Sequence, residues 1–306
     1  MAKDALDVQM KIKKSPGDII ADVLIYILIG VLSFICILPF FHVISTSIST
    51  NSAVAANKVW FLPILSGEGA GVTLDAYKSV IADSSIRWSF IYTVIITVLF
   101  TLLGLFLTIC AAYALSRDRM KGRKTINTLF IITMYFGAGL IPEYLLLDNL
   151  NLLDTTAALV CPLAISAYNM IILRTAMVAI PKSLEEAAQL DGCDDFRILV
   201  QVMLPLVIPT LATLALFYAV GRWNSYSDAM YYIQNDKLKP LQYKLYQLVA
   251  AAADSAALEA DAGSTTQNAE VVKSATIMCA TIPIIVVYPF IQKYFVSGVM
   301  IGAVKE

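Results

Sequence analysis

The chain has 306 residues, of which 58% are hydrophobic and only 15% are charged, and its formal net charge is −1. So few charges cannot cover the surface of a water-soluble domain of this length, so the bilayer is the expected solvent. A near-neutral chain without a large basic block also argues against nucleic-acid binding. The five cysteines show no CxxC or Cys/His spacing, which argues against a disulfide framework or a zinc site.

Six apolar segments reach the roughly 20 residues that a membrane-spanning helix needs. They are residues 19–44, 89–115, 126–147, 157–179, 206–219 extended to about 223, and 275–295. Pro39, Pro283 and Pro289 fall inside the first and last of them, where neighbouring helices can satisfy the freed carbonyls, so we expect kinks rather than breaks. The sequence therefore predicts an all-α integral membrane protein, with a charged segment 1–18 before a six-span domain 19–306.

Lysine and arginine in the short loops predict the orientation of these spans. Segment 1–18 carries four lysines, residues 117–124 carry five basic residues, and loop 148–156 carries none. This asymmetry predicts that both termini and the loop between the fourth and fifth spans are cytoplasmic. Residues 226–273 are then external; in them we expect an amphipathic helix over 241–253, followed by a mobile polar tract over 254–268.

The cytoplasmic loop 181–205 is a short polar interruption with its own helix signals. Ser183 is a candidate N-cap, and Glu185 and Glu186 would favour the dipole of the first turn. Gly192 permits a sharp turn because glycine tolerates positive φ, and a second helix is expected over 194–203. Two short helices at an angle would form a compact cytoplasmic knob.

The residues of this loop follow a recognisable spacing: Glu-Ala-Ala, three residues, Gly, nine residues, Val, one residue, Leu-Pro. The spacing resembles the coupling loop, or EAA motif, of the membrane subunits of bacterial ABC importers, with Val202 where that family usually has Ile. The ATPase-coupling residues that the resemblance implies are Glu186, Ala187, Ala188, Asp191, Gly192, Leu204 and Pro205.

The resemblance extends from about residue 80 to the C-terminus. Ser166-Ala167-Tyr168-Asn169 and the tract 292–298 are similar to carbohydrate permeases of the maltose-transporter type, above all to those for complex oligosaccharides in Gram-positive bacteria. This implies the type I ABC importer permease fold and a multi-pass protein of the bacterial plasma membrane. It also implies a second, similar permease, with a heterodimer favoured, two ATP-binding subunits and an extracellular solute-binding lipoprotein.

The resemblance assigns ATP chemistry to other chains. Glu186 would pair with a basic residue in a groove of the ATPase, and ATP-driven closure would reach the spans through rigid helices. The sequence contains no GxxxxGK[ST] loop, so ATP and Mg²⁺ would be bound by the separate ATPase. We therefore expect no catalytic residue, metal site or cofactor in this chain.

Polar side chains in the spans are candidates for the substrate path. Tyr168, Asn169, Trp223 and Asn224 suit sugars, which present hydroxyls and apolar ring faces, but such residues also join helices through hydrogen bonds. Among ionisable groups, we expect Arg174 to have a structural role in the bundle. Glu143 and Arg222 lie near the outer boundary, where water can solvate them.

The predicted function is ATP-driven, binding-protein-dependent import of a sugar or oligosaccharide. An ABC permease for a peptide, polyamine or phosphate stays open, because such permeases can carry related loops. A self-contained secondary transporter or a membrane enzyme would need intramembrane carboxylates or a nucleophile–base set. The last alternative is a membrane scaffold that transports nothing, but such a protein would have no need for the complete spacing of the coupling loop.

Overall fold

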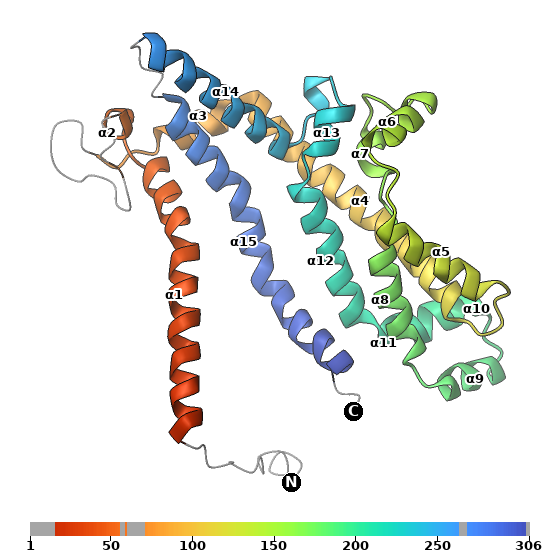
Figure 1. Cartoon of the computed structure of the whole chain (residues 1–306). Coiled ribbons are helices and arrows are strands. Elements are labelled where there is room, and N and C mark those ends of the chain that lie inside the picture. The colour runs from red at the N-terminus through yellow and green to blue at the C-terminus, as the bar shows by residue number, and fades with distance from the viewer. Residues whose placement is uncertain (1–15, 56–58, 60–70, 263–267, 304–306) are drawn as a thin grey trace.

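The computed structural model describes residues 16–55, 59, 71–262 and 268–303, and every element in these ranges is a helix apart from one isolated bridge between Ser49 and Val72 (Figure 1). The α-helices are α1 (Pro16–Ser47), α2 (Asn51–Ala55), α3 (Asp75–Ala82), α4 (Ser84–Ser116), α5 (Arg123–Tyr135), α6 (Leu140–Asn149), α7 (Thr156–Val160), α8 (Ala167–Val178), α9 (Lys182–Leu190), α10 (Asp195–Arg197), α11 (Leu204–Leu206), α12 (Ile208–Asn224), α13 (Ser227–Tyr232), α14 (Leu241–Ala262) and α15 (Asn268–Ala303). A π-helix, η1 (Ile198–Met203), and a 3₁₀ turn, η2 (Asp236–Leu238), complete the order.

The first, second and last predicted spans are continuous helices. They form α1, α4 and α15, of 32, 33 and 36 residues, and Pro39, Pro283 and Pro289 lie inside helices as expected. By length and composition, two helices in the described ranges could each cross a membrane, α1 and α4, or up to four spans result if each bent helix pair counts as one. The count of six spans and the cytoplasmic side of both termini stay predictions.

The third predicted span, residues 126–147, is wrong as a single helix. It consists of α5 and α6, and the chain bends by 115° between these two helices. Gly139 has φ +84° at the start of α6, a conformation open to glycine but unfavourable for other residues. Pro142 then falls in the first turn of α6, where a missing backbone N–H costs no helical hydrogen bond.

The fourth predicted span, residues 157–179, is also interrupted. Helix α7 ends at Val160, and α8 begins only at Ala167. Pro162 lies in the connection, and Leu163 takes a positive φ of 57°. A proline cannot donate to the preceding turn, which ends α7.

The fifth span and the long external helix differ from the prediction in their bounds. Helix α12 starts at Ile208, after an 83° bend from the segment Asp195–Leu206. Helix α14 runs on to Ala262, so most of the tract 254–268 predicted to be mobile is helical. The rest of that tract, 263–267, lies outside the described residues.

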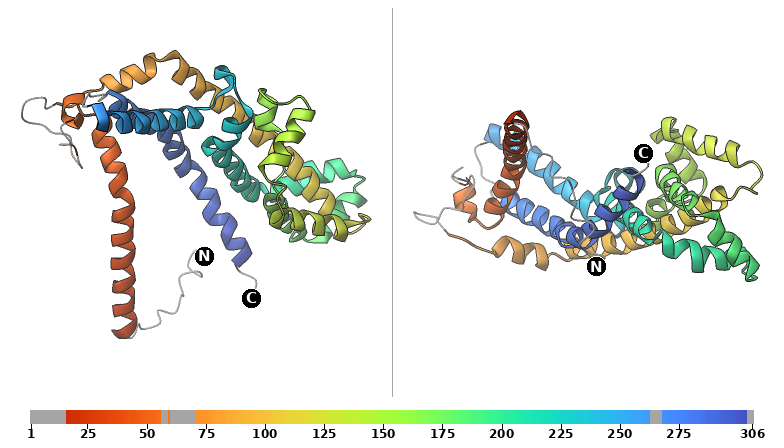
Figure 2. Two further views of the ribbon diagram at one scale, coloured as in Figure 1. Left: turned by 45° about the horizontal axis from the view of Figure 1, so that its top comes forward. Right: turned by 90° about the horizontal axis from the view of Figure 1, so that it is seen from below.

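One of the three clusters of buried residues among the described residues joins α4, α8 and α12 to the 181–205 segment. Helix α1 contacts α15, but its apolar side chains are largely exposed, and it stands apart from the other helices over most of its length (Figure 2). Helices α9 and α10 lie at the opposite end of the molecule from α6 and α13 (Figure 1). The molecule thus has two ends, linked by α4, α8 and α12.

Candidate functional site

Residues 181–205, here called the coupling element, begin with α9. The helix starts at Lys182 with Pro181 at its N-cap and no side-chain cap, so the prediction of Ser183 as N-cap is wrong. Its C-terminus is closed by two backbone bonds, from Gly192 N to Gln189 O and from Cys193 N to Ala188 O, each 3.0 Å. This is a Schellman motif, whose C′ residue must be left-handed, and Gly192 has φ +80°.

The second half of the coupling element turns the chain into α12. Asp194 caps α10 by accepting a 2.9 Å hydrogen bond from the backbone N–H of Arg197. The predicted helix over 194–203 is present, but its residues 198–203 form the π-helix η1. Pro205 lies in the short α11 and lacks the N–H that would continue the ladder. The 83° bend follows at Val207.

One face of the coupling element is buried against the bundle. Ala188, Ile198 and Met203 belong to the same core cluster as Leu115 of α4 and Leu173 of α8. Leu204 packs against this cluster as well. Burial of this apolar face, at about 25 cal/mol per Å², fixes both short helices on the ends of α4 and α8.

Three consecutive residues after α4 hold the coupling element by ion pairs. Arg117 pairs with Glu185, Asp118 pairs with Lys182, and Arg119 pairs with Asp195. The side chain of Arg117 is only 8% exposed, and that of Glu185 is 24% exposed, whereas the partners in the other two pairs are more than half exposed. We call these three pairs the ionic clamp.

Two further contacts reinforce the ionic clamp. The Arg117 guanidinium lies 4.5 Å from the centroid of the Tyr113 ring, a favourable cation–π arrangement. The Tyr113 hydroxyl donates to the backbone oxygen of Asp195 at 2.9 Å. The hydrogen bond from Lys182, with that from Arg123, lowers the pKa of the Asp118 carboxyl, so this member of the clamp is ionised near neutral pH.

Arg174 has the structural position that we expected. Its Nε donates to the backbone oxygen of Leu115 at 2.9 Å. That carbonyl belongs to the last turn of α4, where carbonyl groups have no helical partner and a cation favours the helix dipole. Arg174 therefore closes the end of α4 immediately beside the ionic clamp.

The opposite face of the coupling element is exposed. Glu186 and Ala187 are exposed, and Glu186 makes no ion pair with any residue that the structure describes. Leu190 is 90% exposed and Phe196 is 72% exposed, although both are large and apolar. Two bare apolar side chains beside an unpaired carboxylate are typical of a surface for another protein.

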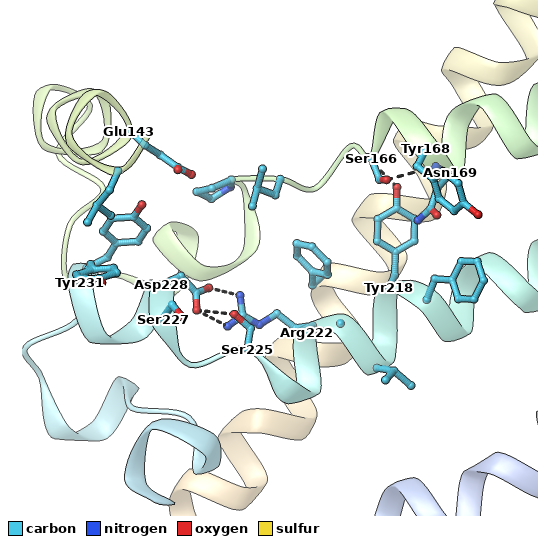
Figure 3. Close-up of a pocket in the computed structure, with 18 of the residues that line it drawn as sticks. Glu143, Ser166, Tyr168, Asn169, Tyr218, Arg222, Ser225, Ser227, Asp228 and Tyr231 are labelled. Carbon is cyan, nitrogen blue, oxygen red and sulfur yellow. Dashed lines mark hydrogen bonds and ion pairs between the residues drawn. The ribbon is translucent and has the colours of Figure 1, made fainter. Parts of the chain in front are cut away.

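A cavity of about 880 Å³ lies toward the other end of α12. Figure 3 shows Glu143 and Tyr231 on one side, Tyr168 and Asn169 on the other, and Arg222 with Asp228 between them. Helices α6, α8, α12 and α13 supply these side chains. Of the four predicted path residues, Tyr168 and Asn169 line this cavity.

The other two predicted path residues lie elsewhere. Trp223 is buried; its indole N–H donates to the backbone oxygen of Ala280 at 3.2 Å, and its ring contacts Phe90 edge-on. Asn224 borders a separate hollow of about 410 Å³ beside α14 and α15. The fold therefore separates the pair 168–169 from the pair 223–224.

Arg222 is not solvated, contrary to the expectation. It is 5% exposed, pairs with Asp228 and donates to the backbone oxygen of Leu159 at 2.9 Å. Ser225 also donates to Asp228, at 2.9 Å. A buried charge needs such a partner because its desolvation costs several kcal/mol, by order of magnitude.

Tyr218 connects the cavity wall to α4. Its hydroxyl lies 2.7 Å from Thr108 Oγ1 and accepts a 3.0 Å bond from the backbone N–H of Ser166. Its ring fills the space over Gly104, where a Cβ would lie 2.8 Å from the ring and 2.9 Å from the Ala164 oxygen. The sequence analysis did not identify Tyr218 or Gly104, because neither residue belongs to a motif.

Comparison with known proteins identifies the chain. A profile for the family described as "binding-protein-dependent transport system inner membrane component" matches residues 125–301, which is more than half of the chain. The chain belongs to this family. Its members are membrane permease components of ABC importers and not catalytic enzymes.

Curated relatives of this permease span nearly its full length. The polygalacturonan/rhamnogalacturonan transport system permease protein YtcP of Bacillus subtilis is 40% identical over 93% of this chain and 98% of its own. Protein LplC of Bacillus subtilis is 40% identical over 93% of this chain and 94% of its own. The arabinooligosaccharides transport system permease protein AraQ of Halalkalibacterium halodurans is 25% identical over 97% and 100%.

A solved structure has the same fold. A chain from the crystal structure of a bacterial ABC transporter involved in import of the acidic polysaccharide alginate is 33% identical, with a TM-score of 0.82 over 92% of this chain and 99% of that chain. A chain from the alginate transporter in complex with alginate pentasaccharide-bound periplasmic protein has a TM-score of 0.58 at 15% identity, a likeness of fold alone.

Proposed function

We propose that this permease imports a sugar or oligosaccharide and that the coupling element is the surface on which the ATPase acts. The names of YtcP and AraQ support the solute class, since both are described as permease proteins of saccharide transport systems. The exposed Leu190, Phe196 and Glu186 support the docking surface. The observation that carries the coupling role is that this bare face belongs to an element clamped to the bundle on its other side.

The mechanism follows from this clamping. A groove on the ATPase holds α9 and α10, and Glu186 pairs with a basic group there. Arg117 and Glu185 make the end of α4 move with α9. Because α4, α8 and α12 share one core, displacement of the coupling element tilts these helices together and changes the opening of the cavity at their other end.

The complete importer then contains further subunits. A second, similar permease supplies the other half of the pathway, and two ATP-binding subunits hold ATP and Mg²⁺. An extracellular solute-binding lipoprotein delivers the saccharide to the outer face, where residues 148–156 and 226–273 are available. The assembly lies in the bacterial plasma membrane with the coupling elements cytoplasmic, and each permease contributes six spans.

The test is isolation of the importer from its native membrane with a tagged permease. An ATP-binding subunit should co-purify with the original chain and be lost with Glu186→Arg, because the substitution places a cation opposite the basic groove. Asp75→Arg is the matched control, since Asp75 is an exposed carboxylate on α3, away from the coupling element. Retention of the ATPase by the Glu186 variant, with saccharide-stimulated ATPase activity unchanged, would refute the docking role.

A further inference from the structure

Two segments that are far apart in the chain meet at the end of the molecule opposite the coupling element, where α7 and α13 lie side by side (Figure 1). The backbone N–H of Asp154, which precedes α7, donates to the backbone oxygen of Tyr232 at 2.9 Å. Its carboxylate Oδ1 accepts from the backbone N–H groups of Gln234 at 3.0 Å and Asn235 at 2.8 Å. We call these three hydrogen bonds the Asp154 tie.

The backbone conformation of Asp154 depends on this tie. Its φ is +55°, in the left-handed region that is unfavourable for most side chains but is visited by Asp and Asn. A residue persists in such a conformation where the surrounding contacts hold it. Asn151, in the same connection between α6 and α7, has nearly the same φ, +53°, but its side chain makes no hydrogen bond with the residues that the structure describes. Asn151 is therefore a control for the conformation alone.

Helix α4 is fastened to the same region. The indole N–H of Trp88 donates to the backbone oxygen of Lys237 at 2.7 Å, and Thr93 Oγ1 accepts from the backbone N–H of Leu241 at 2.8 Å. One buried cluster joins α4 to α7, α13 and the residue after α13; among its members are Tyr92, Ile96, Leu159, Ala229 and Ile233. The helices α7 and α13, with η2, thus form one packed unit on α4, here called the α7–α13 unit.

Helix α4 also reaches the ionic clamp at its other end. It runs without a break over 33 residues, from Ser84 to Ser116, and the clamp begins at the next residue. The other two core helices stop short of the α7–α13 unit, because α8 is separated from α7 by the non-helical residues 161–166 and α12 is followed by the extended Ser225. Of these three helices, α4 therefore gives the continuous connection between the coupling element and the α7–α13 unit.

The Asp154 tie ends on a residue of the cavity wall. Tyr232, whose backbone oxygen accepts the first of the three bonds, lines the 880 Å³ cavity together with Tyr231, and Figure 3 shows Tyr231 on this wall. The Tyr232 ring also contacts Tyr144 of α6, with the ring centroids 6.3 Å apart. The tie therefore fixes the α13 side of the cavity to the connection between α6 and α7.

We propose that Asp154 is a positioning residue for import, because its tie makes the α13 wall of the cavity move as one body with α4. This inference rests on the proposed function and names how displacement of the coupling element reaches the far end of the pathway. Asp154 acts through the backbone of Gln234 and Asn235, since its carboxylate oxygen is directed at N–H groups of its own chain.

Three variants separate the parts of this argument. Asp154→Gly permits the positive φ but removes the acceptor. Asp154→Asn keeps an acceptor oxygen at the same place and also tolerates positive φ. Asn151→Gly is the matched control, because it makes the same kind of backbone change in the same connection and leaves the tie intact.

The first test is hydrogen exchange of the complete importer. The amides of Gln234 and Asn235 should exchange on the order of tenfold faster in Asp154→Gly, because each loses a hydrogen bond to a carboxylate. Asp154→Asn should restore most of the protection, and Asn151→Gly should match the original chain. Unchanged exchange in Asp154→Gly, or an equal acceleration in Asn151→Gly, would overturn the inference.

The second test separates positioning from a role in docking. With the importer in liposomes, the maximal uptake per ATP hydrolysed should fall in Asp154→Gly and recover in Asp154→Asn, while the KM for the loaded binding protein stays the same. A raised KM with an unchanged maximum would make Asp154 a docking contact and would overturn the inference. It would also be overturned by equal uptake per ATP in Asp154→Gly and the original chain, or by a loss that Asp154→Asn does not recover.

Failure of the proposed function gives a different result. If the original chain imported no saccharide, the proposed solute class would be refuted. The exchange rates, and ATP hydrolysis stimulated by the loaded binding protein, would still decide the role of Asp154, because neither depends on the kind of solute. Stimulation should then fall in Asp154→Gly and recover in Asp154→Asn, and equal stimulation in all variants would overturn the positioning role.

Discussion

Removal of the Arg117 guanidinium should release α9 from the bundle. Breaking a fully buried ion pair on one side costs about 3–5 kcal/mol. Because Glu185 keeps 24% of its side-chain surface in water, it can be partly rehydrated, and we expect a smaller cost, about 2 kcal/mol. Loss of the contact between the guanidinium and the Tyr113 ring, 4.5 Å away, is included in this figure.

Hydrogen exchange of the α9 amides measures this cost directly. Local opening made easier by about 2 kcal/mol corresponds to roughly 30-fold faster exchange in Arg117→Gln. The double variant Arg117→Gln with Glu185→Gln should recover a large part of the protection, because no unpaired carboxylate is left. Saccharide uptake should fall relative to ATP hydrolysis in the single variant, because the ATPase would then move a loosened element.

Arg119→Gln is the matched comparison. It removes another arginine of the ionic clamp, but its side chain and that of Asp195 are 59% and 54% exposed, and exposed pairs contribute little. The hydrogen-exchange rates of the α9 amides should change by no more than about twofold. If α9 in Arg117→Gln exchanged like the original chain, or if Arg119→Gln had the larger effect, burial would not be the factor that makes the Arg117 pair dominant.

Three further outcomes follow from the geometry. Gly192→Ala should destabilise the end of α9 by about 1–2 kcal/mol, because the left-handed φ of +80° is unfavourable for any Cβ; exchange of the last α9 amides measures it. Gly104→Ala should lower the midpoint of thermal unfolding in detergent, because its Cβ would lie 2.8 Å from a tyrosine ring. The pair of Asp118 with Lys182 should be insensitive to pH between 6 and 8, since hydrogen bonding lowers the carboxyl pKa and raises the ammonium pKa.

These outcomes have distinct controls. A Cβ at Gly30 in α1 would have no neighbour within 4 Å. Gly30→Ala should therefore be neutral or stabilise the protein slightly, by about 0.5–1 kcal/mol. If Gly30→Ala lowered the stability as much as the other two glycine variants do, both glycine arguments would be refuted. For Asp118, a lowered pKa means that its stabilisation is complete above the unfolded value, about 4, and is lost only as the pH falls through the lowered value. Exchange of α9 that accelerated on going from pH 8 to pH 6, after correction for the intrinsic rate, would contradict this sign.

The local properties of the chain were predictable from its sequence. Continuous apolar segments gave α1, α4 and α15 because helix formation in lipid depends on length and composition. The turn at Gly192 was also predictable, because positive φ is a property of one residue. The spacing around Glu186 gave the family, which the comparison confirmed. Helices α5 and α7 end at Tyr135 and Val160. Gly139 and Pro162 indicate these ends in the sequence, but the long apolar segments around them led to the prediction of continuous spans.

Tertiary structure decided the properties that depend on distant partners. Arg117 and Glu185 are far apart in the chain, so the basic loop at 117–124 could be interpreted as an orientation signal but not as a clamp. Arg222 is buried rather than wet because Asp228 and the oxygen of Leu159 meet it there. The cavity draws its wall from α4, α6, α8, α12 and α13. Which polar side chains meet there depends on how these helices pack, and the sequence pattern of a single helix does not contain that information.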